Sequence, residues 1–104
     1  EGEDWTSGCG GWLYAPISGV VTYNGLDGYV GPHARSGEQN TMLTIRDARS
    51  GESVTLFHGV YSVRVGTRVE AGVTRIGFED KVGNATGCHS HIVRKRHGAV
   101  IPLR

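Results

Sequence analysis

An all-β fold, a small antiparallel sandwich or open barrel of short strands, is predicted by three features of the sequence. Glycine is abundant, at 17 of 104 residues, and stands singly or in pairs between short β-branched runs, as at tight turns between strands. No segment keeps a 3.6-residue apolar period over three turns, so we expect no amphipathic helix. The length suits one domain with a single lean core.

Taken in order, the elements begin with residues 1–11, whose polar and glycine-rich composition predicts a loop. The segments expected to form strands, from their β-branched and aromatic content, are 12–15, 19–23, 41–46, 52–58, 74–78, 89–94 and 100–102. Turn dipeptides at 24–25 and 27–28 predict that the second strand ends there and that a long polar excursion follows over 24–39. Residues 48–51 predict a hairpin turn between the third and fourth strands.

Composition and charge limit the classes of partner. A formal net charge of +1 is too small to argue for nucleic acid or a membrane surface, and no apolar run approaches the ~20 residues of a membrane span. The chain lacks a signal peptide and starts without Met in a polar stretch, so we expect a processed or excised piece of a longer protein. Cys9 and Cys88 allow one disulfide, free thiols or metal ligation, and the sequence leaves these alternatives open.

The strongest chemical signal is the stretch Gly87–Ile92, which contains His89 and His91. These two histidines fall on the same side of an extended strand because side chains alternate between its faces. The pair could share a metal ion, divide its work between ligation and proton transfer, or serve only as hydrogen-bonding groups. A catalytic zinc site usually has three protein ligands and an open position, so the pair needs helpers. His58, at the end of an apolar strand, and Asp4 are candidates, against the plain alternatives of a turn histidine and a surface carboxylate.

Two other patterns point to different chemistry. The acidic pair before Lys81 resembles the tip that carries the modified lysine of biotinyl and lipoyl domains, and 15–21 and 65–72 also fit those barrels. In those domains, however, the lysine precedes the Pro-x-x-Gly-Val-Val element, whereas Lys81 follows it by more than sixty positions. A cysteine nucleophile at Cys88 beside His89 is disfavoured, because adjacent residues on a strand point to opposite faces.

In their order along the chain, the pieces resemble the lysostaphin/LytM-type zinc peptidases, a family of peptidoglycan endopeptidases with the duplicated hybrid motif fold. APISGVV at 15–21 is similar to the family's Ala-Pro-x-x-Gly-x-Val strand, and 40–60 is similar to its Gly-Asn…Tyr-x-His-Leu hairpin. VRVGTRVEAGVTRIGF at 63–78 is similar to its glycine-spaced segment ending in Ile-Gly. GNATGCHSHI at 83–92 is similar to Gly-x-Ser/Thr-Gly-x-His-x-His, the most specific match, and GAVIPL at 98–103 is similar to the closing segment.

The resemblance implies a zinc-dependent endopeptidase that hydrolyses peptide cross-links of bacterial peptidoglycan, with Zn²⁺ as its cofactor. It implies that His58 and His89 are catalytic, taking the proton from water and stabilising the oxyanion, and that Asp4 and His91 are zinc ligands. Asp4 stands twelve residues before the proline of APISGVV, where the family has its ligating Asp. The family's paired histidine would fall one position before the first residue, so the printed chain holds two of the three expected ligands.

The chain also departs from the family pattern. Cys88 and Ser90 stand where the family often has Pro and Leu, and the 24–39 loop, expected to wall a peptide groove, is long. The competing expectation is a catalytically degenerate domain of the same fold that serves as a cell-wall-binding or structural module. The expected partner is a peptidoglycan stem or cross-bridge peptide, with no nucleic acid and no membrane span. We expect an extracytoplasmic location, in the cell wall or periplasm, or a virion-associated one in a larger assembly such as a bacteriophage tail.

Overall fold

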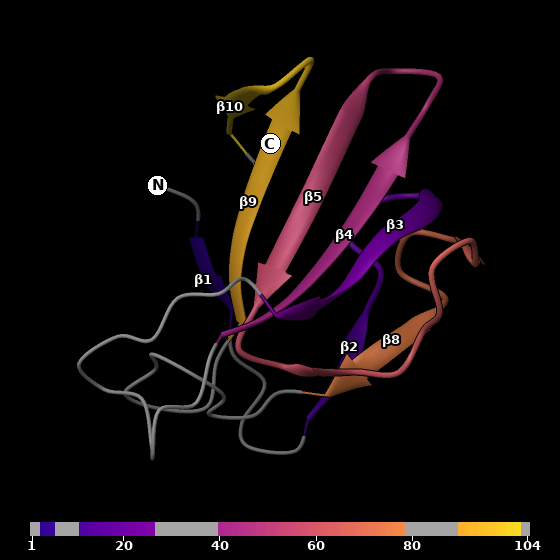
Figure 1. The fold of residues 1–104 in the computed structure, drawn as a ribbon, viewed down its shortest axis with the longest axis vertical. Helices are drawn as coiled ribbons and strands as arrows, with labels where there is room; N and C mark the ends of the chain where they lie inside the picture. The colour runs from indigo at the N-terminus through magenta and orange to yellow at the C-terminus, as the bar shows by residue number, and fades with distance from the viewer. Residues whose placement is uncertain (1–2, 6–10, 27–39, 79–89, 103–104) are drawn as a thin grey trace.

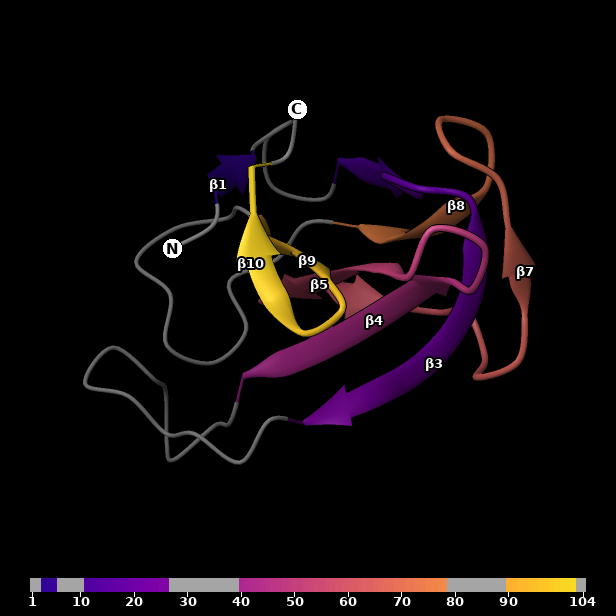
Figure 2. The same ribbon diagram turned by 90° about the horizontal axis from the view of Figure 1, so that it is seen from above.

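The structure, a computed structural model, describes residues 3–5, 11–26, 40–78 and 90–102, and these form two antiparallel sheets (Figure 1). The large sheet has seven strands, in the order β1 (Glu3–Trp5), β9 (Ser90–Arg96), β5 (Glu52–Phe57), β4 (Thr41–Asp47), β3 (Gly19–Leu26) and β7 (Arg68–Val69), with β10 (Ala99–Ile101) also paired to β9. The small sheet has the order β2 (Trp12–Tyr14), β8 (Arg75–Phe78) and β6 (Val60–Tyr61). Figure 2 shows the twist of the large sheet, with β3 curving toward β7 at its edge.

The predicted all-β antiparallel fold is confirmed, and over the residues that the structure describes the sheets do not close into a barrel. Within the described residues there is no helix of the length and apolarity that a membrane crossing requires. The hairpin of β4 and β5 around the turn at 48–51 lies where the sequence predicts it, because both strands alternate buried and less buried residues. The two-residue strands β6 and β7 were not predicted, since runs this short carry no periodicity.

Two sequence-based boundaries are wrong. Residues 1–11 were expected to be a loop, but Glu3–Trp5 forms β1 by pairing with β9. The second strand was expected to end before Asn24, but β3 continues to Leu26 because its pairing with β4 continues. The Asn24 side chain donates hydrogen bonds to the carbonyl oxygens of Tyr61 in β6 and of Val63 just after it, at 3.3 and 2.8 Å, so the amide that would favour a turn is used in a tertiary contact instead. The rest of the predicted excursion, 27–39, lies outside the described residues.

The core lies between the two sheets. Residues of β4, β5 and β9 that are at most 1% exposed are Leu43, Ile45, Val54, Leu56 and Ile92. They meet Leu13 of β2 and Ile76 of β8 from the small sheet. The small sheet is also tightly built, because a Cβ on Gly77 of β8 would collide with the carbonyl oxygen of Val60 in β6. This packing leaves the opposite face of the large sheet turned away from the core.

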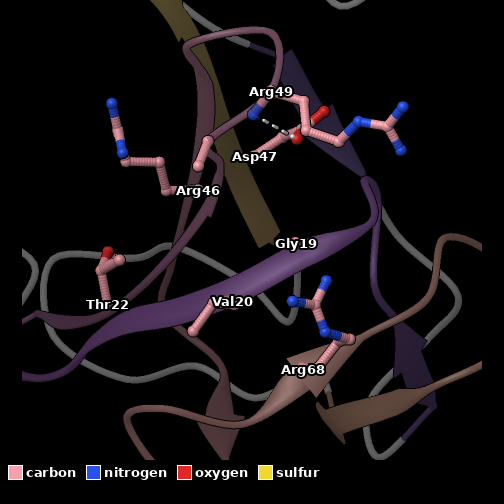
Figure 3. Close-up of a pocket in the computed structure, with 8 residues that line it drawn as sticks. Gly19, Val20, Thr22, Arg46, Asp47, Arg49 and Arg68 are labelled. Carbon is pink, nitrogen blue, oxygen red and sulfur yellow. Dashed lines mark hydrogen bonds between the residues drawn. The ribbon is translucent and has the colours of Figure 1, made fainter.

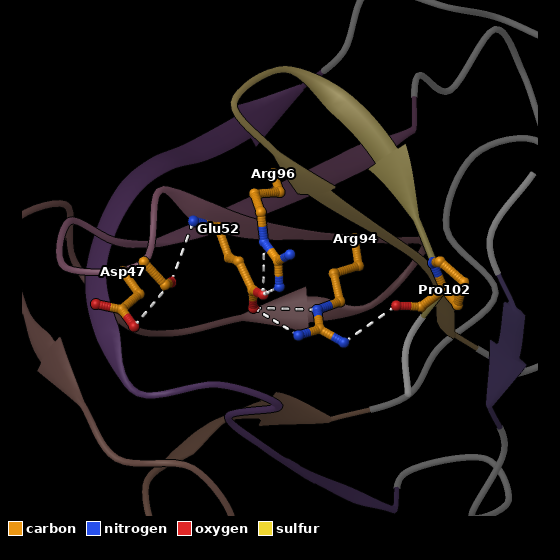
Figure 4. Close-up of polar contacts among 6 residues, drawn as sticks. Asp47, Glu52, Arg94, Arg96 and Pro102 are labelled. Atoms are coloured by element: carbon orange, nitrogen blue, oxygen red, sulfur yellow. Dashed lines mark hydrogen bonds and ion pairs between the residues drawn. The ribbon is translucent and has the colours of Figure 1, made fainter.

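An ion-pair cluster stands at one end of the large sheet (Figure 4). Glu52, at the start of β5, accepts hydrogen bonds from Arg94 at 3.2 and 2.6 Å and from Arg96 through both Nε and Nη2. Arg94 also donates to the carbonyl oxygen of Pro102 at 3.0 Å. The cluster therefore ties β5 to β9 and to the segment that follows β10. Hydrogen bonds from Arg94 and then Arg96 hold the pKa of the Glu52 carboxyl below its ordinary value of 4.5.

Replacing Glu52 by glutamine is expected to lower stability at neutral pH and to flatten its dependence on pH in acid. A carboxyl whose pKa is depressed in the folded state stabilises the protein above its unfolded pKa, and this contribution is lost as pH falls through the folded value. For the unchanged protein, the free energy of unfolding should therefore fall as pH drops below about 4.5. Thermal melts of Glu52→Gln and of the control Glu70→Gln, an exposed position, from pH 7 to pH 3 test this. Parallel curves for both variants would contradict it.

Candidate active site

His58 follows directly after β5 and is buried, with 8% of its surface exposed. Its backbone lies in the left-handed region, with φ at 71°, which histidine adopts more readily than most residues but still uncommonly. The His58 N–H donates to the carbonyl oxygen of Thr41 at 3.3 Å, and its ring lies tilted beside that of Phe57, with centroids 6.3 Å apart. Positive φ alone does not mark a site, because His97, at the turn after β9, has φ at 51°.

A hydrogen-bonded frame fixes the backbone on both sides of His58. The Tyr61 hydroxyl donates to the carbonyl oxygen of Phe57 at 3.0 Å and accepts from the Gly59 N–H at 3.2 Å. The Thr41 hydroxyl donates to the carbonyl oxygen of Gly59 at 2.6 Å. Both neighbours of His58 are therefore held by side chains from other strands. Such support keeps a residue in an otherwise unfavourable conformation, an arrangement common at functional sites.

The register of the large sheet brings Asp4 and His91 to the same end. His91 of β9 is paired with Phe57, the residue before His58. On the other side of β9, His91 is paired with Asp4 of β1. Neighbouring strands lie about 4.7–4.9 Å apart, so the positions of Asp4, His91 and Phe57 span about 10 Å across three strands. Residues more than 80 positions apart in the sequence are thus adjacent at one edge of the fold.

The sequence-predicted site residues divide into two groups. The register brings Asp4, His91 and the His58 end of β5 together, whereas His89 lies outside the described residues. Cys9 and Cys88, the residues of the disulfide alternative, also lie outside the described residues, and so does Lys81, the residue of the carrier-domain alternative. Among the side chains that the structure describes, no group of three His, Cys, Asp or Glu residues could hold a metal ion; the side chains of Asp4, His89 and His91 are not in that set.

Sequence reasoning missed the residues that support His58. Thr41 and Tyr61 act through hydrogen bonds that join separate strands. No local sequence pattern predicts hydrogen bonds of this kind. Asn40, which is 8% exposed, is a buried polar residue just before β4. Its place in the segment that resembles the family's Gly-Asn motif was the one available signal.

Comparisons with known proteins identify the fold. No protein-family model matches the chain, and no curated protein sequence matches it. A zinc-containing peptidase from Vibrio cholerae matches with a TM-score of 0.78 and 21% identity, over 98% of this chain and 28% of that one. The catalytic domain of the antimicrobial peptidase lysostaphin from Staphylococcus simulans matches with a TM-score of 0.75 and 23% identity, over 96% and 72%. The catalytic domain of the prophage-encoded protein EnpA from Enterococcus faecalis, in a variant form, gives 0.72 and 19%, over 98% and 74%.

The chain therefore has the fold of the lysostaphin-type peptidases, and the resemblance predicted from the sequence is confirmed at the level of the fold. It spans little more than a quarter of the Vibrio chain but nearly three quarters of the two catalytic domains. The similarity thus extends over one domain and not over the whole length of the Vibrio protein.

Proposed function

We propose that this chain is the catalytic domain of a zinc-dependent endopeptidase that hydrolyses peptide cross-links of bacterial peptidoglycan. The sequence motifs that resemble the lysostaphin/LytM-type peptidases support this, as does the similarity of fold to zinc-containing and antimicrobial peptidases. The single observation that carries the proposal is the register of the large sheet. It pairs Asp4 with His91 and places His91 beside the strand end that bears His58.

The donor set at this edge fits zinc. A carboxylate oxygen and an imidazole nitrogen are ordinary zinc ligands, and directly paired residues of antiparallel strands have Cβ atoms about 4.5–5.5 Å apart. Asp4 and His91 would therefore be two of the ligands of Zn²⁺. Zinc, when bound, polarises the scissile carbonyl and lowers the pKa of water toward neutrality. Asp4 and His91 contribute by keeping that ion at the edge of a rigid sheet.

His58 and His89 would carry the proton transfer. An imidazole with a pKa near neutrality can take a proton from the attacking water and later return it to the leaving amine. In its protonated form it also stabilises the negative charge that develops on the carbonyl oxygen. The hydrogen-bonded frame of Thr41 and Tyr61 supports this role for His58, because proton transfer depends on accurate placement of the base.

A second candidate function is a domain of the same fold without activity, used for cell-wall binding or as a structural module. The observation in its favour is that the chain departs from the family pattern at Cys88 and Ser90, which stand beside His89 and His91. The prophage origin of one similar protein is compatible with either function in a phage-associated assembly. For both candidate functions, the proposed location is extracytoplasmic, in the cell wall or periplasm, or virion-associated.

Zinc content and peptidoglycan digestion together test the proposal. We expect a version of the chain that includes the residues encoded just before Glu1 to bind about one zinc per molecule and to release free amino groups from purified peptidoglycan. A chelator should abolish the release, and added zinc should restore it. The same protein with Asp4→Ala is the matched control and should lose both properties. If the longer chain binds no zinc and releases no amino groups, the non-catalytic function replaces the catalytic one.

A further inference from the structure

A row of positively charged residues crosses the large sheet at the end opposite to His58. Following the register from β7 to β9, Arg68 is paired with Val20, Val20 with Arg46, Arg46 with Ser53, and Ser53 with Lys95. Directly paired residues of antiparallel strands project from the same face. We call this set, Arg68, Arg46 and Lys95 separated by Val20 and Ser53, the cationic row.

The cationic row lies on the face turned away from the core. Ile45 and Val54, the neighbours of Arg46 and Ser53 along their strands, are fully buried, and successive residues of a strand point to opposite faces. Arg46, Arg68 and Lys95 are each exposed. On β5 the row passes through Ser53, which lies four residues before Phe57. At 3.3 Å per residue this separation is about 13 Å. A ligand held here would leave the His58 end of the sheet free.

The charges of the row are not neutralised by the described part of the chain. No carboxylate among the described side chains forms an ion pair with Arg46, Arg68 or Lys95, whereas the nearby Arg94 and Arg96 share Glu52. The acidic residue next to Arg46 in the sequence, Asp47, is bonded within its own turn. Its oxygens accept hydrogen bonds from the Arg49 N–H and the Ser50 hydroxyl, each at 3.0 Å.

A surface hollow of about 200 Å³ opens within the row (Figure 3). Its lining includes Gly19, Val20 and Thr22 of β3 together with Arg46, Arg49 and Arg68, and it also includes one acidic residue, Asp47. Figure 3 shows Arg46 and Arg68 on the two sides of β3, with Val20 between them. Three arginine residues thus contribute to one concave surface, and guanidinium groups match phosphate oxygens through paired hydrogen bonds.

The spacing of the charges indicates the shape of the ligand. Strands about 4.8 Å apart place successive cations of the row about 10 Å apart and make the row about 20 Å long. A single small anion could contact only one or two of them, so the complete row requires a ligand with repeated charges. The sheet twists by about 20–25° per strand, so the row is curved. A flexible chain can follow that curve, whereas a flat bilayer or a stiff duplex would touch only part of it.

We propose that the cationic row binds a flexible linear phosphate polymer that lacks stacking bases. Phosphate is favoured because guanidinium groups match its oxygens in paired hydrogen bonds and because a phosphodiester or polyphosphate chain keeps its negative charge over a wide pH range. Bases are not required, because Val20 and Ser53 stand between the cations, and the row lacks the aromatic platform on which single-stranded nucleic acids stack. The proposal is independent of zinc binding and of peptidase activity.

Binding of fluorescently labelled long-chain inorganic polyphosphate, followed by anisotropy at several salt concentrations, tests the proposal. Arg46→Glu, at the centre of the row, should weaken binding by roughly tenfold or more and should reduce the slope of log K against log salt by about one. Arg64→Glu is the matched control, because Arg64 is also exposed but lies outside the row, and it should change binding less than about twofold. Lys95→Glu provides a second test at another strand, and circular dichroism reports the folding of each variant.

Three results would overturn the proposal. The first is no measurable binding of polyphosphate by the unchanged protein at low salt. The second is an equal loss of binding in Arg46→Glu and Arg64→Glu, which would mean that net charge alone is responsible. The third is tighter binding of oligothymidylate or of vesicles rich in anionic lipid than of polyphosphate, which would assign the row to nucleic acid or to a membrane surface.

Discussion

Replacing His58 by alanine is expected to lower peptidoglycan hydrolysis by about 100-fold or more while bound zinc stays near one per chain. In the proposed site His58 moves a proton and stabilises the oxyanion, but it does not ligate the metal. Replacing His91 by alanine should instead remove the zinc, and with it the activity, since His91 is a proposed ligand. Elemental analysis and release of amino groups from peptidoglycan, measured on the zinc-binding version of the chain, separate these two roles.

The left-handed backbone at His58 calls for a second substitution. Alanine is strained at φ 71°, whereas asparagine tolerates that region, so His58→Asn tests the loss of the imidazole with less disturbance of the fold. His97→Ala is the matched control, because His97 also has positive φ but follows β9 at the opposite end of the sheet, and it should leave activity unchanged. His89→Ala should behave like His58→Ala. Equal zinc content in all variants, His91→Ala included, would contradict the proposed division of roles.

The fold was largely predictable because its longest elements carry local patterns. In β5, Val54 and Leu56 alternate with less buried residues, and the turn before the strand has a recognisable composition. The failures occurred where pairing between distant segments decides the structure. β1 is a strand only because Glu3 and its neighbours pair with β9, and Asn24 is in a strand because the pairing of β3 with β4 continues past it.

The same distinction applies to the sites. Resemblance in the sequence could nominate Asp4, His58 and His91, because each lies in or near a motif. It could not show that the register places Asp4 opposite His91. The cationic row could not be predicted from the sequence either, because it also depends on the register between strands. A net charge of +1 is too small to indicate a polyanion partner, but the pairing of the strands places Arg68, Arg46 and Lys95 on one face of the large sheet.

The second large effect is expected in the core beneath the candidate site. Leu56 is 1% exposed and is paired with Leu43 on one side and Ile92 on the other, both 0% exposed. Leu56→Ala should lower the free energy of unfolding by about 2–5 kcal/mol, because the truncation removes buried area and leaves a cavity that well-packed neighbours fill only partly. That loss is a large share of the roughly 5–15 kcal/mol that stabilises a typical domain. Denaturant unfolding at neutral pH measures it.

Val65→Ala is the matched control for this truncation. Val65 is apolar but 61% exposed, so its shortening should change stability by no more than about 0.5 kcal/mol. Leu56→Met, which keeps the volume, should cost less than about 1.5 kcal/mol. Because Leu56 stands only two residues before His58, Leu56→Ala should also loosen the strand end that positions the imidazole. Hydrolysis measured well below the melting temperature should then fall in Leu56→Ala more than in Val65→Ala. Equal stability of the two variants would show that the Leu43–Leu56–Ile92 row does not anchor this end of the sheet.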